Sequence, residues 1–318
     1  MISSYTFGIY PRSEELIEVT RKNTENLDSL SQKETEEYIT AQKNANLGFV
    51  SDPLLKWDDI FRLFSNLSEV TPTALNRIYE MNTFYRVLSF DGSAFTDGGN
   101  TVKSNLDSSL PKNKTVAIPE PFTFAELHTS NESKRKEDFV LNLAKMLRVE
   151  IDSLVESGFE VIQLLAPSIA YNKEVDFGVV SDALKIITDG LKAKTILHTY
   201  FGDVSTKIES LLDLPVSGLG FDITTTPASS IEKHSFSNKS LTIGIINSFN
   251  TAIEKPQECI KQIDEINAKT ILTQSGFLIR EISASDTSKP AGEILAQAPE
   301  AGATKTIGSV VTITVNRN

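Results

Sequence analysis

The fold of this chain is decided by the stretch Lys194-Thr-Ile-Leu-His-Thr-Tyr-Phe-Gly-Asp-Val204 and its continuation Ser217-Gly-Leu-Gly-Phe-Asp-Ile223. The first part is a short β-branched apolar run that stops at His198. A helical pattern of apolar residues follows, and a second apolar run then begins at Leu219 and ends on Asp222. Strand, helix and strand in this order, with polar groups where each strand ends, predict a parallel α/β barrel that carries its chemistry at those ends.

The same alternation of strand and helix patterns extends over roughly the first 260 residues, the usual length of such a barrel. Strand signals occur at 7–12, 49–50, 84–93, 115–124, 161–165 and 241–246, and helical signals at 31–45, 57–64, 138–157 and 177–192. We therefore expect an α/β fold, a TIM (β/α)8-type barrel, over residues 1–261.

The pattern changes near residue 262, where short apolar runs separated by Gly and Pro turns begin. Ser309 to Val315 alternates cleanly, which predicts a strand with one face packed on a helix that contains Ala268 and Leu272. Residues 262–318 are therefore expected to form a small α+β C-terminal module. The alternative is that 270–273 forms the eighth barrel strand and the remainder is a β appendage.

Composition excludes several classes of partner and site. The 318 residues carry a formal net charge of −11, so a nucleic acid is not an expected partner. The single cysteine, Cys259, excludes an internal disulfide and a thiolate-rich zinc site built from this chain alone. The first residues lack a signal-peptide pattern, and no window approaches the roughly 20 apolar residues that span a bilayer. We expect a cytoplasmic protein with no membrane partner.

The segment 194–223 resembles a stretch of the cobalamin-independent methionine synthase family, and particularly of its non-catalytic N-terminal half. Five further fragments resemble that family in the right order: Gly8-Ile-Tyr-Pro-Arg12, Asn82-Thr-Phe-Tyr-Arg86, Ile118-Pro-Glu-Pro-Phe-Thr-Phe124, Glu160-Val-Ile-Gln-Leu-Leu-Ala-Pro-Ser168 and Thr242-Ile-Gly-Ile-Ile-Asn247. The C-terminal fragments Gly292-Glu-Ile-Leu-Ala-Gln-Ala-Pro299 and Gly308-Ser-Val-Val-Thr-Ile-Thr-Val315 resemble the PASTA module of bacterial cell-wall kinases and penicillin-binding proteins.

The resemblance implies where a catalytic site would lie. The family's catalytic half binds zinc through His, Cys, Glu and Cys, and the zinc turns homocysteine into a thiolate that attacks methyltetrahydrofolate. In this chain His198 stands at the histidine, Tyr200 at the first cysteine and Asp222 near the carboxylate, with Ser275 nearest to the last cysteine. These make His198, Tyr200 and Asp222 the catalytic candidates, although a structural histidine at a strand end is the favoured interpretation of His198. No metal site is predicted, because a His and Asp pair binds zinc poorly.

Two acids that hold the amino acid's ammonium group in the family are also replaced, by Leu165 and Ala166. The resemblance therefore implies a barrel of the non-catalytic N-terminal type. Such a barrel would help to bind a methyl donor, methyltetrahydrofolate or a related pterin, and would pair with a separate zinc-containing catalytic barrel.

Four residues are candidates for binding the methyl donor. Arg12, Arg21 and Lys22 are cations that would suit a polyglutamate tail, a chain of carboxylates, unless they are merely solvated. Trp57 would cap a pocket, unless it belongs to an amphipathic helix face. The alternative function is a non-enzymatic scaffold whose PASTA-type tail binds cell-wall peptide or a partner.

Overall fold

The structure of the chain is a computed structural model that describes residues 3–22, 26–91, 99–130, 135–236, 238–247 and 253–317. The chain divides into two compact units. The first contains Met1–Thr199 and Leu214–Gly218, and the second contains Tyr200–Asp213 and Leu219–Asn318.

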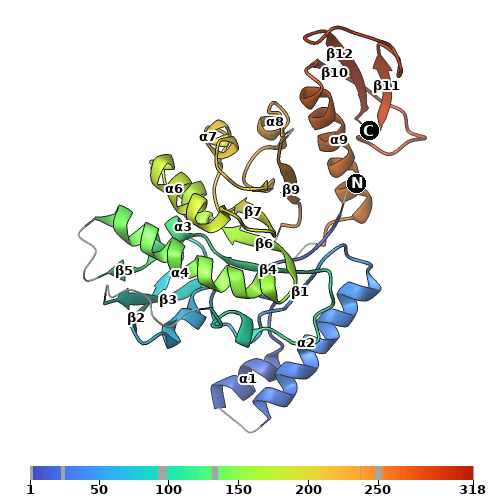
Figure 1. Ribbon diagram of the computed structural model, residues 1–318. Coiled ribbons are helices and arrows are strands. Elements are labelled where there is room, and N and C mark those ends of the chain that lie inside the picture. Colours follow the sequence, from blue (N-terminus) through green and yellow to red (C-terminus); the bar gives the residue numbers. More distant parts are fainter. Residues whose placement is uncertain are drawn as a thin grey trace. The chain divides into compact units, whose positions relative to one another are not determined.

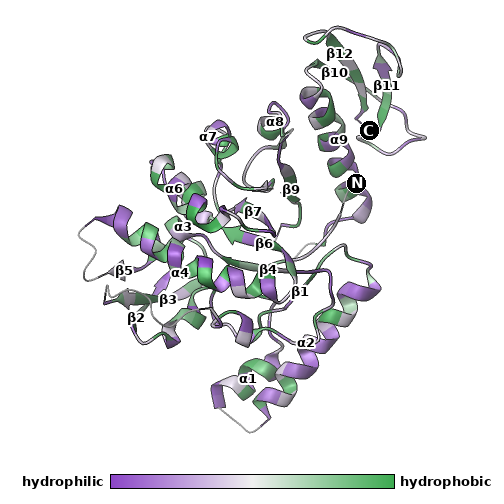
Figure 2. Ribbon diagram, in the orientation of Figure 1, coloured by the Kyte–Doolittle hydropathy of each residue, from purple (hydrophilic) through white to green (hydrophobic). Residues whose placement is uncertain are grey.

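A parallel sheet forms the core of the first unit. Its strands lie in the order β1 (Val50–Ser51), β4 (Lys114–Pro119), β6 (Phe159–Leu165) and β7 (Lys194–Thr199). The strands β4, β6 and β7 are buried on both faces, as is typical of parallel sheets, and β6 shows as a mostly hydrophobic ribbon in Figure 2. Figure 1 shows α4 running along the front of these strands.

The helices of the first unit alternate with these strands, as a barrel of TIM type requires. They are α1 (Glu14–Lys22), α2 (Leu27–Asn44), α3 (Pro121–Leu127), α4 (Lys136–Glu156), α5 (Pro167–Tyr171) and α6 (Phe177–Thr188). The long helix α4 buries Leu143, Leu147, Ile151 and Leu154, which stand three or four residues apart on one face. It packs against α6 and β6 on that face.

A second, smaller sheet interrupts the alternation. β2 (Val70–Arg77) and β3 (Phe84–Phe90) form an antiparallel pair, and β5 (Thr129–Ser130) joins β3 in parallel. Short 3-10 helices, η1 (Arg62–Asn66) and η2 (Lys103–Asn105), flank this hairpin in the chain. Around His128, rings of Phe61, Tyr85, Phe90 and Phe124 pack within 6.4 Å of its ring centroid.

The second unit contains α7 (Ile208–Leu212), β8 (Gly218–Asp222) from Leu219 onward, α8 (Ala228–Ile231), β9 (Ser240–Gly244) and the long helix α9 (Pro256–Gln274). A three-stranded sheet follows, made of β10 (Leu278–Ala284), β11 (Ile294–Ala298) and β12 (Val310–Asn316). Its order is β10-β12-β11, with β10 parallel and β11 antiparallel to the central β12. Val311, Ile313 and Val315 of β12 form its core, against which Leu272 of α9 packs. The alternation of the last strand therefore buries one face on the preceding helix, as its sequence predicts.

Three expected elements, and one alternative, differ from the structure. Residues 7–12 form no strand, because Gly8 has a φ of 91° and Pro11 lacks an N–H group for a sheet. Residues 57–64 form turns and the start of η1 rather than a helix, because the buried carboxylate of Asp59 accepts the N–H groups of Phe61 and Arg86. Side-chain capping of this kind competes with helical hydrogen bonds.

The other two differences concern a strand end and a helix. The strand expected over 115–124 ends at Pro119, since Glu120 begins α3. Residues 270–273 lie inside α9 and are not a barrel strand. No helix in the described part of the chain is long and apolar enough to cross a membrane.

Candidate functional site

The ends of three neighbouring strands in the first unit are tied together by backbone hydrogen bonds. The N–H of Glu120, after β4, donates to the carbonyl oxygen of Leu165 over 3.0 Å, and the N–H of Ala166, after β6, donates to the carbonyl oxygen of His198 over 2.9 Å. The register agrees, because Pro119 pairs with Leu165 and Leu165 with His198. The residues that follow β4 and β6 therefore lie at one edge of the sheet with the end of β7, where barrel enzymes carry their chemistry.

Glu120 is fully buried and fixed by the helix that it begins. Its two carboxylate oxygens accept the N–H groups of Phe122 and Thr123, each over 2.8 Å, and Pro121 occupies the first helical position. A carboxylate is favoured at a helix N-terminus, where backbone N–H groups lack partners. Burial nevertheless raises the pKa of Glu120 to about 7, so this carboxyl group exchanges a proton near neutral pH.

Ser168 and two tyrosines lie beside this cap. The N–H of Ser168 donates to Thr123 Oγ1 over 3.3 Å, and the Ser168 hydroxyl is hydrogen-bonded to the hydroxyl of Tyr79. Tyr79 comes from the turn between β2 and β3, where its φ is 50°, and its ring stacks on Tyr171 with centroids 3.9 Å apart and planes at 20°. Burial raises the pKa of Tyr79, so its hydroxyl stays protonated. We call Glu120, Thr123, Ser168, Tyr79 and Tyr171 the strand-end cluster.

The strand-end cluster combines groups of three kinds. It has a buried carboxyl group, three hydrogen-bonded hydroxyl groups and a pair of stacked rings, of which Tyr171 is 42% exposed. Such a combination suits a flat, polar, aromatic ligand, which needs a ring to stack on and hydrogen-bonding groups at its edge.

His198 lies at the end of β7 with its ring packed on Phe7, the two ring centroids being 4.4 Å apart. Burial lowers the pKa of His198 to about 3, so the imidazole is neutral at physiological pH. Gln163 of β6 pairs with Ile196 of β7. Ile196 precedes His198 by two residues, so its side chain lies on the same face of the sheet as that of His198. Gln163 is fully buried, and neither amide atom of its side chain has a hydrogen-bond partner among the described residues.

The other two catalytic candidates belong to the second unit. Tyr200 packs its ring on Phe201, with centroids 4.5 Å apart. Asp222 ends β8, and its Oδ1 accepts the N–H and the hydroxyl of Thr224 over 2.9 and 2.6 Å. This carboxylate thus closes the turn after its strand. In the described part of the chain, no group of three or more His, Cys, Asp or Glu residues is placed to hold a metal ion.

The structure brings together two of the four candidates for methyl-donor binding. Arg12 Nη2 donates to the backbone oxygen of Trp57 and to Asp58 Oδ1, each over 2.8 Å. The Trp57 side chain is fully buried, and its indole N–H has no partner among the described residues. Arg21 and Lys22 contact neither Arg12 nor Trp57 in any ion pair of the described residues. They lie at the exposed end of α1, where their side-chain nitrogens approach the Glu18 carboxylate to 2.8 and 3.1 Å, respectively.

Sequence reasoning missed most of the strand-end cluster. The signal for Glu120 was an acid between two prolines directly after a buried strand, which marks a helix start at a strand end. Ser168 stands after the next strand in the same way. Tyr79 and Tyr171 carried no such signal, because a hydrogen bond or ring contact between positions some 90 residues apart leaves no local pattern.

Comparison with known proteins agrees with this architecture. Residues 50–271 match the model of the cobalamin-independent synthase N-terminal domain, and residues 260–317 match that of the PASTA domain. A methionine synthase of Saccharolobus solfataricus is 30% identical over 164 residues, which cover 50% of this chain and 48% of that protein. A methionine synthase of Saccharolobus islandicus is 32% identical over 164 residues, which again cover 50% of this chain and 48% of that protein. The match thus spans about half the length of these curated relatives.

Two solved structures share the fold. A B12-independent methionine synthase from Shewanella sp. W3-18-1, in complex with selenomethionine, superposes with a TM-score of 0.59 at 17% identity and covers 78% of both chains. A methyltransferase from Methanosarcina mazei gives a TM-score of 0.55 at 12% identity over 82% of this chain and 83% of that one. The family model covers more than two thirds of the sequence, and the chain therefore belongs to the cobalamin-independent methionine synthase family, by its N-terminal domain, and carries a C-terminal PASTA domain.

Proposed function

We propose that this chain is a methyl-donor-binding barrel that works with a separate, zinc-containing catalytic barrel. Its ligand would be methyltetrahydrofolate or a related pterin. The observation that carries the proposal is the strand-end cluster, in which the Tyr79 ring stacks on Tyr171 and the Tyr79 hydroxyl is hydrogen-bonded to Ser168 at the edge of the parallel sheet. A pterin ring is flat and aromatic, and its edge offers several hydrogen-bonding groups, so stacking and hydroxyl contacts would both contribute to its binding.

The amino-acid acceptor would bind elsewhere. Leu165 and Ala166, both buried, occupy the positions where the family has acids for the ammonium group of homocysteine. Neither side chain offers a charge, and burying an ammonium group against them would be costly. Leu165 and Ala166 are therefore consistent with a barrel that binds the methyl donor and does not bind homocysteine.

The donor set also does not fit a resident zinc ion. His198 offers a neutral imidazole, but its ring is buried against Phe7. Tyr200 replaces a thiolate, and the Asp222 carboxylate already accepts two hydrogen bonds from Thr224. Zinc sites usually need three or four His, Cys or acidic ligands in tetrahedral geometry. We therefore propose that the homocysteine thiolate is generated on a partner barrel.

Calorimetry with 5-methyltetrahydrofolate tests the proposal directly. The parent chain should bind it, and Tyr171→Ala should weaken binding about fivefold, because an aromatic pair contributes about 1 kcal/mol. Tyr10→Ala is the matched control, since Tyr10 is also exposed and packs on another tyrosine, Tyr38, at 4.5 Å. Absence of binding by the parent chain, or equal loss in both variants, would reject a donor site at the strand-end cluster.

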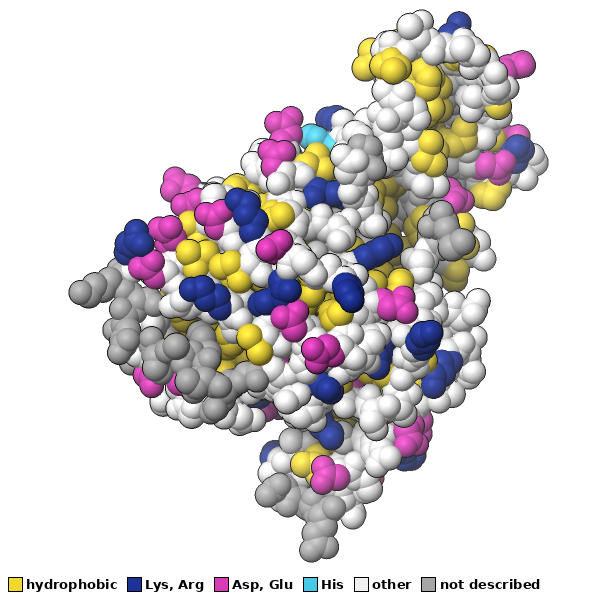
Figure 3. Space-filling model, viewed as in Figure 1, with side chains coloured by type: hydrophobic (Ala, Val, Ile, Leu, Met, Phe, Trp, Pro, Cys, Tyr) yellow, Lys and Arg dark blue, Asp and Glu magenta, His cyan; other side chains and the backbone are white. Residues whose placement is uncertain are grey.

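A second candidate function rests on the PASTA domain. The solvent face of its sheet carries Leu278 and Ile282 on β10 and Val310 on β12, all exposed, and hydrophobic side chains gather there in Figure 3. In this reading the chain is a scaffold whose C-terminal sheet binds cell-wall peptide or a partner protein. Binding of purified muropeptides that is lost in Ile282→Lys, with folate binding unaffected, would favour this function over the first.

A further inference from the structure

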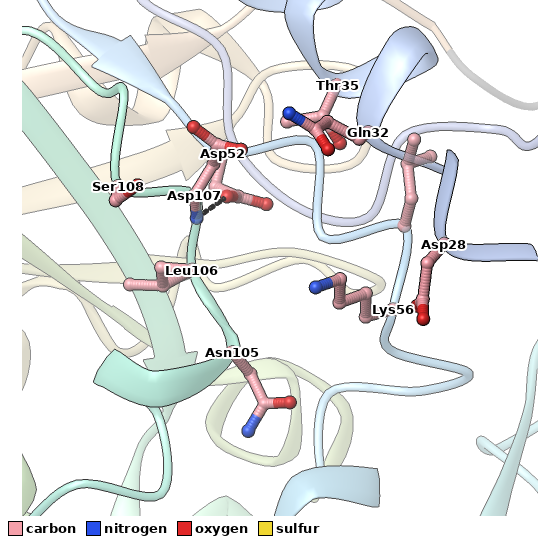
Figure 4. A pocket seen from close by; sticks show the side chains of 10 residues that line it. Asp28, Gln32, Thr35, Asp52, Lys56, Asn105, Leu106, Asp107 and Ser108 are labelled. Atoms are coloured by element: carbon pink, nitrogen blue, oxygen red, sulfur yellow. Dashed lines mark hydrogen bonds between the residues drawn. The ribbon is translucent and has the colours of Figure 1, made fainter. Parts of the chain in front are cut away.

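The first unit contains a polar cavity of about 420 Å³ away from the strand-end cluster in sequence (Figure 4). Three segments line it. Helix α2 contributes Asp28, Gln32 and Thr35, the segment after β1 contributes Asp52 and Lys56, and the residues from the end of η2 onward contribute Asn105, Asp107 and Ser108. Only Leu55 and Leu106 give it apolar wall. Its volume lies in the range of small-molecule sites, which span about 300–1,000 Å³.

One wall of the cavity is held rigidly in place. Asp52 is 7% exposed, and its two carboxylate oxygens accept the N–H groups of Leu54 and Asp107, each over 2.7 Å. The bond to Asp107, dashed in Figure 4, ties the segment after β1 to the segment after η2. Asp107 Oδ1 in turn accepts the N–H of Ser109 over 2.7 Å, so both carboxylates are held before any ligand binds, which reduces the entropy lost on binding.

Two other lining groups lack partners. Among the described residues, no carboxylate lies within ion-pair distance of the Lys56 ammonium group, although Lys56 acts electrostatically on Asp52. Thr35 is 7% exposed, and its hydroxyl has no hydrogen bond to any described residue. A buried hydroxyl group and a cation that both face a polar cavity and remain unpaired in the protein are free to bind a solute.

We propose that this cavity binds a small amino acid with a basic side chain. The ligand's carboxylate would pair with Lys56, and its two ammonium groups would pair with the lining aspartates, while Thr35, Gln32 and Asn105 complete the hydrogen bonds. Three lining carboxylates against one lysine favour a ligand with a net positive charge over a neutral zwitterion. This site is independent of the proposed methyl-donor site, so either stands if the other fails.

Three probes of matched length separate the parts of the proposal. L-Lysine has the carboxylate and both ammonium groups, L-norleucine lacks the second ammonium group, and cadaverine lacks the carboxylate. Calorimetry on the full chain should rank lysine first. Lys56→Met should weaken lysine binding about tenfold, the loss typical of a charge-assisted hydrogen bond, and leave cadaverine binding no weaker. Asp52→Asn should weaken both.

Matched controls guard against general effects of charge. Lys33→Met on α2 and Asp182→Asn on α6 alter exposed charges outside the cavity lining and should leave lysine binding unchanged. Thr35→Val keeps the shape of the threonine and should reduce lysine affinity while leaving the thermal midpoint nearly unaltered. No binding of any probe at millimolar concentration, or equal effects of Lys56→Met on lysine and cadaverine, overturns the proposal.

Discussion

The ammonium group of Lys269 lies 3.1 Å from the carboxylate of Glu232, a contact between helix α9 and the residue that ends α8. Lys269 also contacts Glu265 and Glu281 at 2.7 and 2.8 Å, and its side chain is only 10% exposed. Arg317, near the C-terminus, contacts the same Glu265 and Glu281. Five charges thus connect the barrel segment around α8 to α9 and to the PASTA sheet within the second unit.

Lys269→Met should destabilise the second unit by about 3 kcal/mol, because it leaves Glu232 without its cation and only Arg317 to neutralise Glu265 and Glu281. Burial disfavours the charge of Lys269, but its hydrogen bonds to the three glutamates outweigh this and raise its pKa. Urea unfolding measures the effect. Lys289→Met is the control, since the Lys289–Glu293 pair is exposed and should contribute little to stability. Equal losses in the two variants would show that the network adds little.

Acidification below pH 6.5 should destabilise the first unit through His198. Burial lowers its pKa to about 3 in the folded protein, so the unfolded chain takes up a proton that the folded chain refuses. Stability is therefore complete above the ordinary histidine pKa and falls as the pH drops toward 3, by about 1.4 kcal/mol at pH 5.5.

The measurement compares unfolding free energies of the parent and His198→Gln between pH 7.5 and 5. Burial raises the pKa of Glu120 to about 7, so Glu120 titrates in the same pH window and stabilises the protein as the pH falls. Because Glu120 is present in both proteins, the difference between their unfolding free energies isolates the effect of His198. A slope unchanged in His198→Gln contradicts the assignment.

The purified chain should contain well under one equivalent of zinc. A neutral His198, with Tyr200 in place of a thiolate, supplies too few ligands to retain the ion. Metal analysis of protein prepared without chelator and then dialysed is the measurement. Stoichiometric zinc that disappears in His198→Ala would instead indicate an active methyltransferase.

A C-terminal fragment should fold alone, and its stability should depend on where it begins. The core of Val311, Ile313 and Val315 with Leu272 lies entirely after residue 262. A fragment from Gln262 keeps this core but removes the first six residues of α9, Pro256 to Lys261. We expect cooperative melting of a fragment from Lys255 at a higher temperature than one from Gln262. An unfolded Lys255 fragment would mean that the PASTA sheet depends on the barrel.

The strands and helices that the sequence predicted well are those with strong, continuous burial. Val161 to Leu165 lies within β6, where a continuous apolar run matches a strand buried on both faces. The helix expected at 138–157 is α4, where apolar residues repeat every three or four positions along the buried face. The β2–β3 hairpin was only half predicted. Nearly all of β2 is exposed and contains Pro72, so it shows neither apolar alternation nor a strand composition.

The site was predictable only in its location. Polar residues at the ends of β-strands indicated the edge of the sheet at which the candidate cluster lies, and His198 lies at the end of β7. The partners of that edge come from distant segments: Phe7 from the N-terminal residues and Tyr79 from the hairpin. The sequence around His198 contains no trace of Phe7, so the burial that makes its imidazole neutral became visible only in three dimensions.

The two family matches overlap over residues 260–271, which lie inside the uninterrupted helix α9. The end of the first match and the start of the second therefore share one continuous helix. An α-helix turns about 100° and advances about 1.5 Å for each residue. A single residue inserted early in α9 would rotate Lys269 away from Glu232 and carry the whole C-terminal sheet round with it. Within the second unit, the number of residues between the start of α9 and Lys269 therefore decides which face of the helix reaches Glu232 of the α8 segment.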